Sequence, residues 1–355
     1  MLIFVFIVAL IVFYEMKIAD NNEFHKDYIS PKSTKAVNGL FTMLIFLSHS
    51  VQYIDLGSVL DTPYTTMKSH LGQMVVVTFL FYSGYGIMES IKKKGTDYVK
   101  SIPTKRFFKV LYHMAIAVTM FVVLNLVLGI KYDLKRILLA YTGWMSIGNS
   151  NWYIFAVLVL YVITFISFMI FRKNRYLAVT AVTALTAAYV YALMVFDIDS
   201  WYYDTVIMFA MGMWYSLFRE RIEKVIMKND LVYLIVGGSA VALYYFTFLK
   251  RKGGIEWYTA WAIMFMALVV LFTMKMKIGN RILDWFGSHI FSVYILQRIP
   301  MIILKHFGLN ESHKYAFIVV SFFATIVLAA AFDTVIAKLD GMIYRPKKIK
   351  AEIEI

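Results

Sequence analysis

The sequence predicts an all-α protein, a polytopic α-helical membrane bundle with about eleven transmembrane helices. Of its 355 residues, 61% are hydrophobic and only 16% are charged, whereas soluble domains have about 45–50% apolar and about 25% charged residues. Apolar runs near the roughly 17–25 residues of a membrane-spanning helix recur along the chain. They are continuously apolar, whereas the strands of a membrane barrel alternate. These observations exclude a water-soluble globular protein.

We expect the spans at residues 1–16, 36–54, 72–90, 107–130, 152–171, 176–196, 201–218, 230–249, 256–274, 285–304 and 316–337. The first is the weakest, because it reaches only about 24 Å against a hydrocarbon core of about 30 Å. It lacks a basic leading region and a clear cleavage site, so it is predicted to be an uncleaved membrane anchor. The segment 131–151 is too short to cross twice, which predicts an interfacial or re-entrant piece.

The basic residues orient these spans. Lys and Arg number 36 against 22 Asp and Glu, a net charge of +14. If the first span runs inward, 26 of the 36 lie in cytoplasmic segments, 9 lie outside, and Arg298 lies within a span. Because basic residues concentrate on the cytoplasmic side, this predicts a multi-pass cell-membrane protein with an outside N-terminus and a basic cytoplasmic tail at 338–355. The net charge then requires no nucleic acid, and none is expected as a partner.

Several classes of catalytic site are excluded by composition. The chain has no cysteine, which rules out disulfides, thiolate metal sites and a cysteine nucleophile. It has no P-loop, GxGxxG, HExxH or GxSxG motif, and its histidines lack metal-ligand spacing, so no metal is predicted. The informative residues are therefore polar ones inside spans, where each costs free energy unless it is paired or faces a cavity.

The span 36–54 is the richest in such residues. Asn38 and His49 are eleven residues apart, so they share one helix face about 16 Å apart, and Thr42 and Tyr53 extend this stripe. Imidazole exchanges a proton near neutral pH, which makes His49 a candidate catalytic base. The alternatives are a histidine hydrogen-bonded within the bundle, or an acyl intermediate on the neighbouring Ser48 or Ser50.

Other spans carry weaker signals. Gly84 and Gly86 remove side chains, which favours close helix packing over ligand approach. Asp204 lies near the outer end of its span, where it could orient a histidine, bind a sugar hydroxyl or simply be solvated. Gln297 and Arg298 lie deeper; a guanidinium there must snorkel, pair or line a polar cavity, and cavity lining is favoured.

Six elements in order resemble the acyltransferase 3 family of integral membrane acyltransferases, over about residues 32–337. They are Asn38-Gly39 with His49, Phe79-Leu-Phe-Tyr-Ser-Gly-Tyr85, Lys105-Arg106, Trp152-Tyr153 with Tyr161, Trp201 to Gly212, and Gly287 to Pro300. The resemblance implies a ten-helix core behind the extra N-terminal helix at 1–16.

The resemblance also implies transfer of an acyl group, usually acetyl, from acetyl-CoA or another acyl-CoA to a hydroxyl of a cell-surface or exported glycan. His49 would be the catalytic base. The residues that would bind substrate or donor are Lys35, Asn38, Ser83, Tyr85, Lys105, Arg106, Trp152, Asp204, Gln297 and Arg298. Asn38 stands where the family usually has a cation, which Lys35, one turn earlier, could replace.

The expected partners are the lipid bilayer, acyl-CoA and the hydroxyl-bearing acceptor. A homo-oligomer is also compatible with the sequence. Two other function classes stay open at the level of sequence. One is a membrane transporter or flippase for a sugar or lipid-linked substrate. The other is a non-catalytic membrane scaffold, in which His49 and Arg298 would have no evident use.

Overall fold

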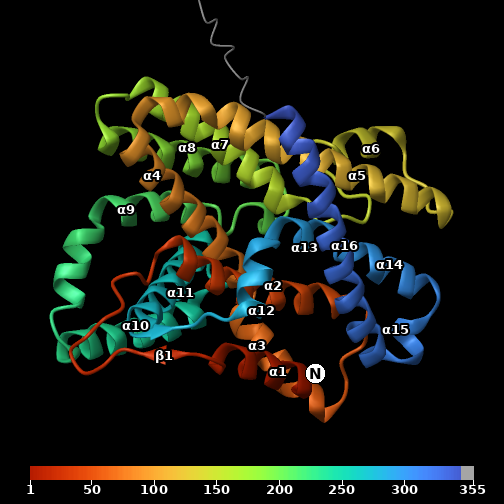
Figure 1. Ribbon diagram of the computed structural model, residues 1–355, viewed down its shortest axis with the longest axis horizontal. Helices are drawn as coiled ribbons and strands as arrows, with labels where there is room; N and C mark the ends of the chain where they lie inside the picture. The colour runs from red at the N-terminus through yellow and green to blue at the C-terminus, as the bar shows by residue number, and fades with distance from the viewer. Residues whose placement is uncertain (345–355) are drawn as a thin grey trace, which may run out of the picture.

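The computed structural model describes residues 1–344 and confirms the all-α bundle (Figure 1). The elements of the first half are α1 (Leu2–Phe13), β1 (Lys17–Ile18), α2 (Pro31–Ser50), η1 (Val59–Asp61), α3 (Thr62–Leu71), α4 (Met74–Ile102), η2 (Pro103–Phe108), α5 (Lys109–Val127), α6 (Leu134–Ala140) and α7 (Trp152–Ile170). Those of the second half are α8 (Arg175–Val195), η3 (Ser200–Tyr202), α9 (Ile207–Ile226), α10 (Asp230–Lys250), α11 (Ile255–Lys275), β2 (Met276–Lys277), α12 (Arg281–Ser288), α13 (Ile290–Leu296), α14 (Arg298–His306), α15 (Leu309–Ser312) and α16 (Lys314–Ile343).

Within residues 1–344, six helices are long and apolar enough to cross a membrane, or seven if a bent pair counts as one span. One of the six is the stretch Met74–Val127, which covers most of two predicted spans. It is broken at Gly95, whose backbone is not helical (φ 58°, ψ −142°). The chain is therefore a multi-pass helical membrane protein. The number eleven and the inside or outside position of each end stay predictions.

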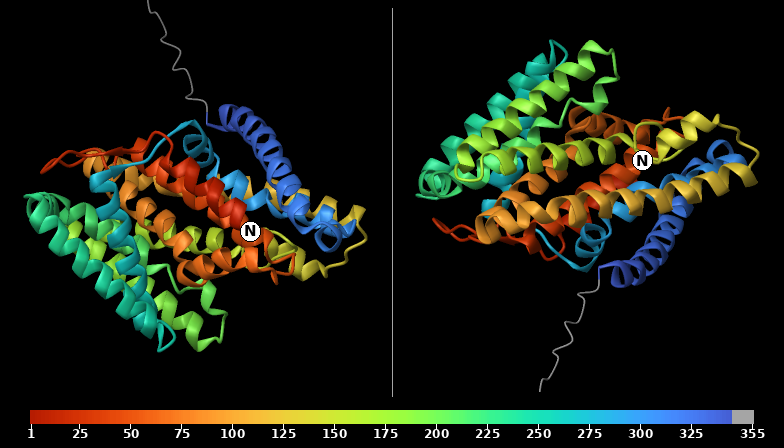
Figure 2. Two further views of the ribbon diagram at one scale, coloured as in Figure 1. Left: turned by 90° about the horizontal axis from the view of Figure 1, so that it is seen from below. Right: turned by 90° about the horizontal axis from the view of Figure 1, so that it is seen from above.

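The loops alternate between two ends of the bundle. At the basic end, β1 pairs antiparallel with β2, Lys17 opposite Lys277, and Lys92 donates a hydrogen bond to the Ser216 carbonyl of α9. The other end is called the cavity end below, because the cavity lined by Ser150 and Arg298 lies there. At this end Arg298 contacts Ser150, and Lys314 at the start of α16 contacts Asp61 before α3. The α10–α11 hairpin and α16 lie on opposite sides of the bundle (Figures 1 and 2).

Two helix pairs approach most closely through glycines. A Cβ on Gly84 of α4 would overlap the backbone of Phe209 on α9, and a Cβ on Gly212 of α9 would overlap the backbone of Phe81. The pair α2–α12 repeats this arrangement with Gly39 and Gly287. Small residues let helix backbones approach in a membrane, where dispersion contacts rather than the hydrophobic effect hold helices together. Gly84 thus serves helix packing.

The predicted span at 285–304 contains a break, because the chain bends by 69° between α12 and the following helices. His289 lies at the break. Its backbone leaves the helical conformation (φ −113°, ψ 25°), and its Nδ1 donates to the Trp285 carbonyl at 2.7 Å while its ring stacks on the Trp285 indole. Side-chain insertion into the hydrogen-bond ladder is a known cause of helix kinks.

The helices at the two ends of the chain have other bounds than the predicted spans 1–16 and 316–337. Helix α1 has 12 residues, about 18 Å of helix, and all its residues are at least partly exposed apart from its cap, Met1. Helix α16 continues to Ile343, so the first residues of the predicted tail at 338–355 are helical. The remainder of that predicted tail, 345–355, lies outside the described residues.

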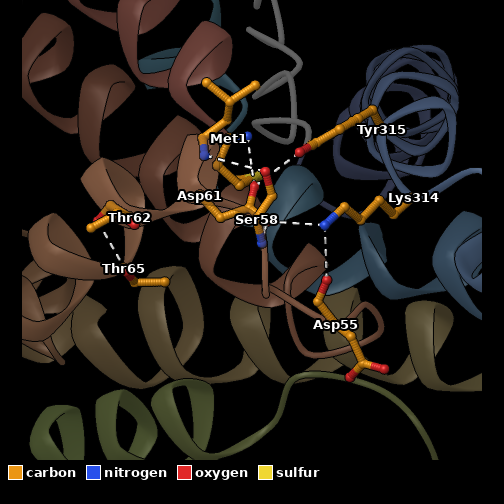
Figure 3. A network of polar contacts seen from close by, with 9 residues as sticks. Met1, Asp55, Ser58, Asp61, Thr62, Thr65, Lys314 and Tyr315 are labelled. Atoms are coloured by element: carbon orange, nitrogen blue, oxygen red, sulfur yellow. Dashed lines mark hydrogen bonds and ion pairs between the residues drawn. The ribbon is translucent and has the colours of Figure 1, made fainter.

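A buried carboxylate joins α1, α3 and α16 at the cavity end (Figure 3). Asp61 is 1% exposed. It accepts hydrogen bonds from the Met1 amino group (3.0 Å), Lys314 Nζ (2.9 Å), Tyr315 OH (3.0 Å) and the Ser58 backbone N–H (3.2 Å). Because two cations compensate its charge, the free-energy cost of burying the carboxylate is offset.

Candidate active site

A cavity of about 890 Å³ opens among α2, α4, α7 and the α13–α14 segment at the cavity end. Its size falls within the roughly 300–1,000 Å³ of ligand pockets. Polar side chains contribute much of its lining. They are Ser48, His49, Gln52, Tyr53, Gln73, Asn125, Tyr132, Ser146, Asn149, Ser150, Asn151, Tyr294, Arg298, Lys305 and His306.

His49 lies on the last turn of α2 and lines this cavity. Helix α2 begins sharply, because the Ser30 hydroxyl accepts from the Ser33 backbone N–H and Pro31 occupies the first turn. Nδ1 of His49 is buried without a hydrogen-bond partner among residues 1–344. The alternative of a histidine hydrogen-bonded into the bundle through Nδ1 is therefore not seen in this structure.

Ser48 and Ser50 flank the histidine but differ in environment. Ser48 lines the cavity. Ser50 is fully buried, and its hydroxyl donates to the Leu47 carbonyl at 2.9 Å. Of the two serines, only Ser48 is therefore accessible from the cavity.

Arg298 lines the cavity and is held by three neutral oxygens. Its Nε donates to Ser150 Oγ at 3.2 Å, Nη1 to Tyr53 OH at 3.1 Å and Nη2 to Gln52 Oε1 at 2.7 Å. Gln52 and Tyr53 follow His49 by three and four residues and lie in the turn directly after α2. Arg298 is thus positioned beside the histidine by the same segment that presents it.

Gln297 and Trp152 are also placed near this cavity. Gln297 is 0% exposed; its Nε2 donates to the Tyr294 carbonyl at 3.0 Å, and its Oε1 has no partner within the described chain. Trp152 opens α7 and lines the cavity. Gln297 lies behind the cavity wall and does not line it.

A row of aromatic side chains leads from His49 toward the basic end. The His49 and Tyr294 ring centroids are 6.1 Å apart, and those of Tyr294 and Tyr153 are 5.5 Å apart. Two turns further along α7, the Tyr161 hydroxyl lies against Arg106 and Ser83. Arg106 also donates to Tyr98 OH at 3.2 Å. The sequence-predicted residues Ser83 and Arg106 therefore meet at the far end of this row.

The remaining predicted residues lie away from the cavity. Lys35 and Asn38 are on the first turns of α2, and Asn38 Oδ1 is buried without a partner in residues 1–344. Tyr85 OH accepts from Arg219 Nη1 at 2.9 Å, whereas Lys105 is exposed. Asp204 accepts from Ser200 Oγ at 2.9 Å and does not line the cavity.

Sequence reasoning missed the loop 146–151, which forms one wall of the cavity. Asn149 Oδ1 accepts from the Ile147 N–H at 3.0 Å, and Asn125 Nδ2 donates to the Ile147 carbonyl at 2.8 Å. The run Asn149-Ser150-Asn151 directly before an apolar span was the available signal. Tyr294, inside the predicted span 285–304, was missed as well. Gln52, Lys305 and His306 were missed because polar residues at span ends are ordinary.

Residues 36–334 match the family model described as an acyltransferase domain. The chain belongs to the acyltransferase 3 family. The match covers most of the sequence, and it supports an acyltransferase embedded in a membrane. No curated protein and no solved structure matches the chain.

The described part of this acyltransferase contains no group of three or more His, Asp or Glu side chains that could hold a metal ion. The site instead offers an imidazole, a guanidinium, hydroxyls and amides around a cavity of small-molecule size. Such groups can bind a polyol, move a proton and stabilise negative charge.

Proposed function

We propose that this acyltransferase moves an acyl group, acetyl by preference, from acyl-CoA to a hydroxyl of a cell-surface or exported glycan bound in the 890 Å³ cavity. The observation that carries the proposal is the position of His49, whose ring lines the cavity and whose Nδ1 lacks a hydrogen-bond partner in the described chain. The family membership supplies the reaction class.

In the proposed reaction, His49 acts as general base. It removes the proton from the acceptor hydroxyl as the oxygen attacks the thioester carbonyl. The new C–O ester bond forms, the C–S bond breaks, and the proton passes from the imidazole to the departing CoA thiolate. Ser48 offers a route through an acyl-serine, but no hydrogen bond to a base orients it among the described contacts.

The donor is proposed to reach His49 from the basic end. The phosphates of CoA cannot enter hydrocarbon, so they require cations at a membrane surface, and Lys105 and Arg106 are exposed there. The row from Arg106 through Tyr161 and Tyr153 to Tyr294 connects that end with His49. In this arrangement Lys105 and Arg106 bind phosphate, Ser83 lies along the row, and Trp152 contacts the acceptor.

A transporter or flippase is the second candidate, and the bend between α12 and α13 favours it. Secondary transporters bind substrate at broken helices near the membrane centre, and the 69° break at His289 is such a feature. Purified protein in detergent distinguishes the two functions, because turnover of acetyl-CoA without separate compartments requires an enzyme.

The test uses the full chain in detergent with radiolabelled acetyl-CoA and glycans extracted from the cell surface. His49→Ala is expected to lower acetyl transfer by roughly 10²–10⁴-fold, the usual contribution of a general base. His313→Ala, an exposed histidine outside the cavity, is the matched control and should retain activity. Thermal unfolding checks that both variants are folded.

Wild-type rates in His49→Ala would contradict the proposed role of His49. Mass spectrometry of surface glycans from cells with and without the gene tests the substrate class. An acetyl-sized mass difference on one glycan is expected. Unchanged glycans together with no detergent turnover would contradict acyl transfer to a glycan.

A further inference from the structure

The charged side chains that line the cavity have one sign. Arg298 and Lys305 line it together with two histidines, His49 and His306, and no Asp or Glu lines the cavity as residues 1–344 form it. Arg298 is partly buried, whereas Lys305 is exposed. An apolar or neutral ligand would therefore cover Arg298 and leave its charge without compensation in a partly enclosed space, where charge is costly.

Arg298 is the clearest case of an uncompensated charge. Its three described hydrogen bonds go to a serine hydroxyl, a tyrosine hydroxyl and a glutamine carbonyl oxygen, all of them neutral. A guanidinium has five N–H donors, so two are left. No carboxylate lies within ion-pair distance of Arg298 or Lys305 in the described chain, although nine such pairs occur elsewhere in it.

Acidic residues are present at this end of the bundle, but they pair with or cap other groups outside the cavity. Asp61 is paired with Lys314 and the Met1 amino group. Asp133 caps α6 by accepting from the Arg136 backbone N–H, and Asp204 accepts from Ser200. None of the three lines the cavity. The positive charge of the lining is therefore a local property of the cavity, because this end of the bundle does contain aspartates.

We propose that the acceptor is anionic, a glycan whose carboxylate or phosphate group binds Arg298 and Lys305 while a hydroxyl of the same or the adjacent sugar faces His49. This rests on the proposed acyl transfer. The placement suits it, because Gln52 and Tyr53, which hold Arg298, lie in the turn that directly follows the last turn of α2, where His49 is. A planar guanidinium with two remaining donors matches a carboxylate or phosphate oxygen pair.

The experiment compares three tetrasaccharides of one backbone: a glucuronic acid oligomer, its carboxyl-reduced neutral form, and the neutral form phosphorylated at the same carbon. Binding to the full-length protein in detergent is measured by calorimetry, and acetyl transfer from acetyl-CoA is measured separately. At least one charged oligosaccharide is expected to bind tenfold or more tightly than the neutral one. The two charged arms distinguish a carboxylate from a phosphate group.

Two variants assign the preference to the cavity. Arg298→Gln and Lys305→Gln are each expected to raise the Kd of the charged oligosaccharide about tenfold or more while changing that of the neutral form little. Lys252→Gln removes an exposed cation of the same end that does not line the cavity, and it should preserve the preference. Raising the salt concentration should weaken the charged ligand selectively.

Three results would overturn the anionic acceptor. One is equal binding of charged and neutral forms, including no binding of either. Another is a preference that survives both substitutions. The third is an equal fall in kcat for charged and neutral acceptors in Arg298→Gln with unchanged binding, which would assign Arg298 to the transition state alone. Charge-selective binding without any acetyl transfer would support the anion site and contradict the proposed transferase function, so the two failures are distinguishable.

Discussion

Asp61 shows how a single residue secures the cavity end. Burial by itself would raise the pKa of this carboxyl, but hydrogen bonds from Lys314, the Met1 amino group, the Ser58 backbone and Tyr315 outweigh it and hold the pKa well below its ordinary value. The folded state therefore favours the ionised carboxylate. The stability contributed by Asp61 is fully present above the unfolded-state pKa of about 3.9 and is lost as pH falls toward the lower folded-state pKa.

Asp61→Asn is accordingly expected to destabilise the protein at pH 7, on the order of 1.5–3 kcal/mol, the usual worth of hydrogen bonds to a charged group. The difference from wild type should shrink as pH falls below about 4, where the wild-type carboxylate begins to lose its advantage. Thermal unfolding in one detergent across pH 3–8 measures both effects. Asp55→Asn is the control, because only the Asp55 backbone carbonyl contacts Lys314. A pH-independent difference would contradict this account of Asp61.

Part of the candidate site could be predicted from individual residues of the sequence. His49 and Arg298 are ionisable groups inside apolar runs, where they are expensive, so sequence alone selects them and the structure places both in one cavity. Asp204 gave the same kind of signal but lies outside the cavity. Lys305 and Gln52 gave none, because they occupy span ends, where polar residues cost little.

At the scale of elements, the glycine contacts fix how closely α4 and α9 can pack. Gly84 faces the Phe209 backbone, whereas a Cβ on Gly86, two residues later in the same helix, would meet open space. The sequence segment containing both glycines indicated packing or ligand approach without separating their roles. Only the neighbouring helix decides which glycine is required.

Gly84→Ala is expected to lower stability by about 1–3 kcal/mol, the usual cost of overpacking, because the new methyl group must push α9 away. Gly86→Ala is the matched control; it should be neutral or stabilising by up to about 1 kcal/mol, since alanine favours helix over glycine. Detergent thermal unfolding of the two variants provides the comparison. Equal stability of Gly84→Ala and Gly86→Ala would exclude a special contact at Gly84.

At the scale of the whole molecule, the alternation of loops determines which segments share an end. The pairing of Lys17 with Lys277 and the contact of Lys314 with Asp61 each join segments that the charge pattern assigns to one side. The excess of basic residues at one end predicts that this end faces the cytoplasm.

The absence of cysteine from the chain makes this orientation directly measurable. Lys252→Cys at the cavity end and Lys93→Cys at the basic end each introduce a single thiol at an exposed position. A membrane-impermeant maleimide applied to intact cells should label the Lys252→Cys protein and leave the Lys93→Cys protein unlabelled until the cells are opened. The reverse pattern would place the cavity in the cytoplasm and would contradict transfer to an exported glycan.

The sequence by itself determined the class of protein, the positions of its apolar helices and the two costly ionisable residues, His49 and Arg298. These follow from composition and local periodicity, since each apolar run in a membrane must satisfy its backbone hydrogen bonds within its own helix. Only the tertiary structure decided the bend at His289, the choice between Gly84 and Gly86, and the convergence of the loop 146–151 with Arg298. Those depend on contacts between segments far apart in the chain, which no local pattern encodes.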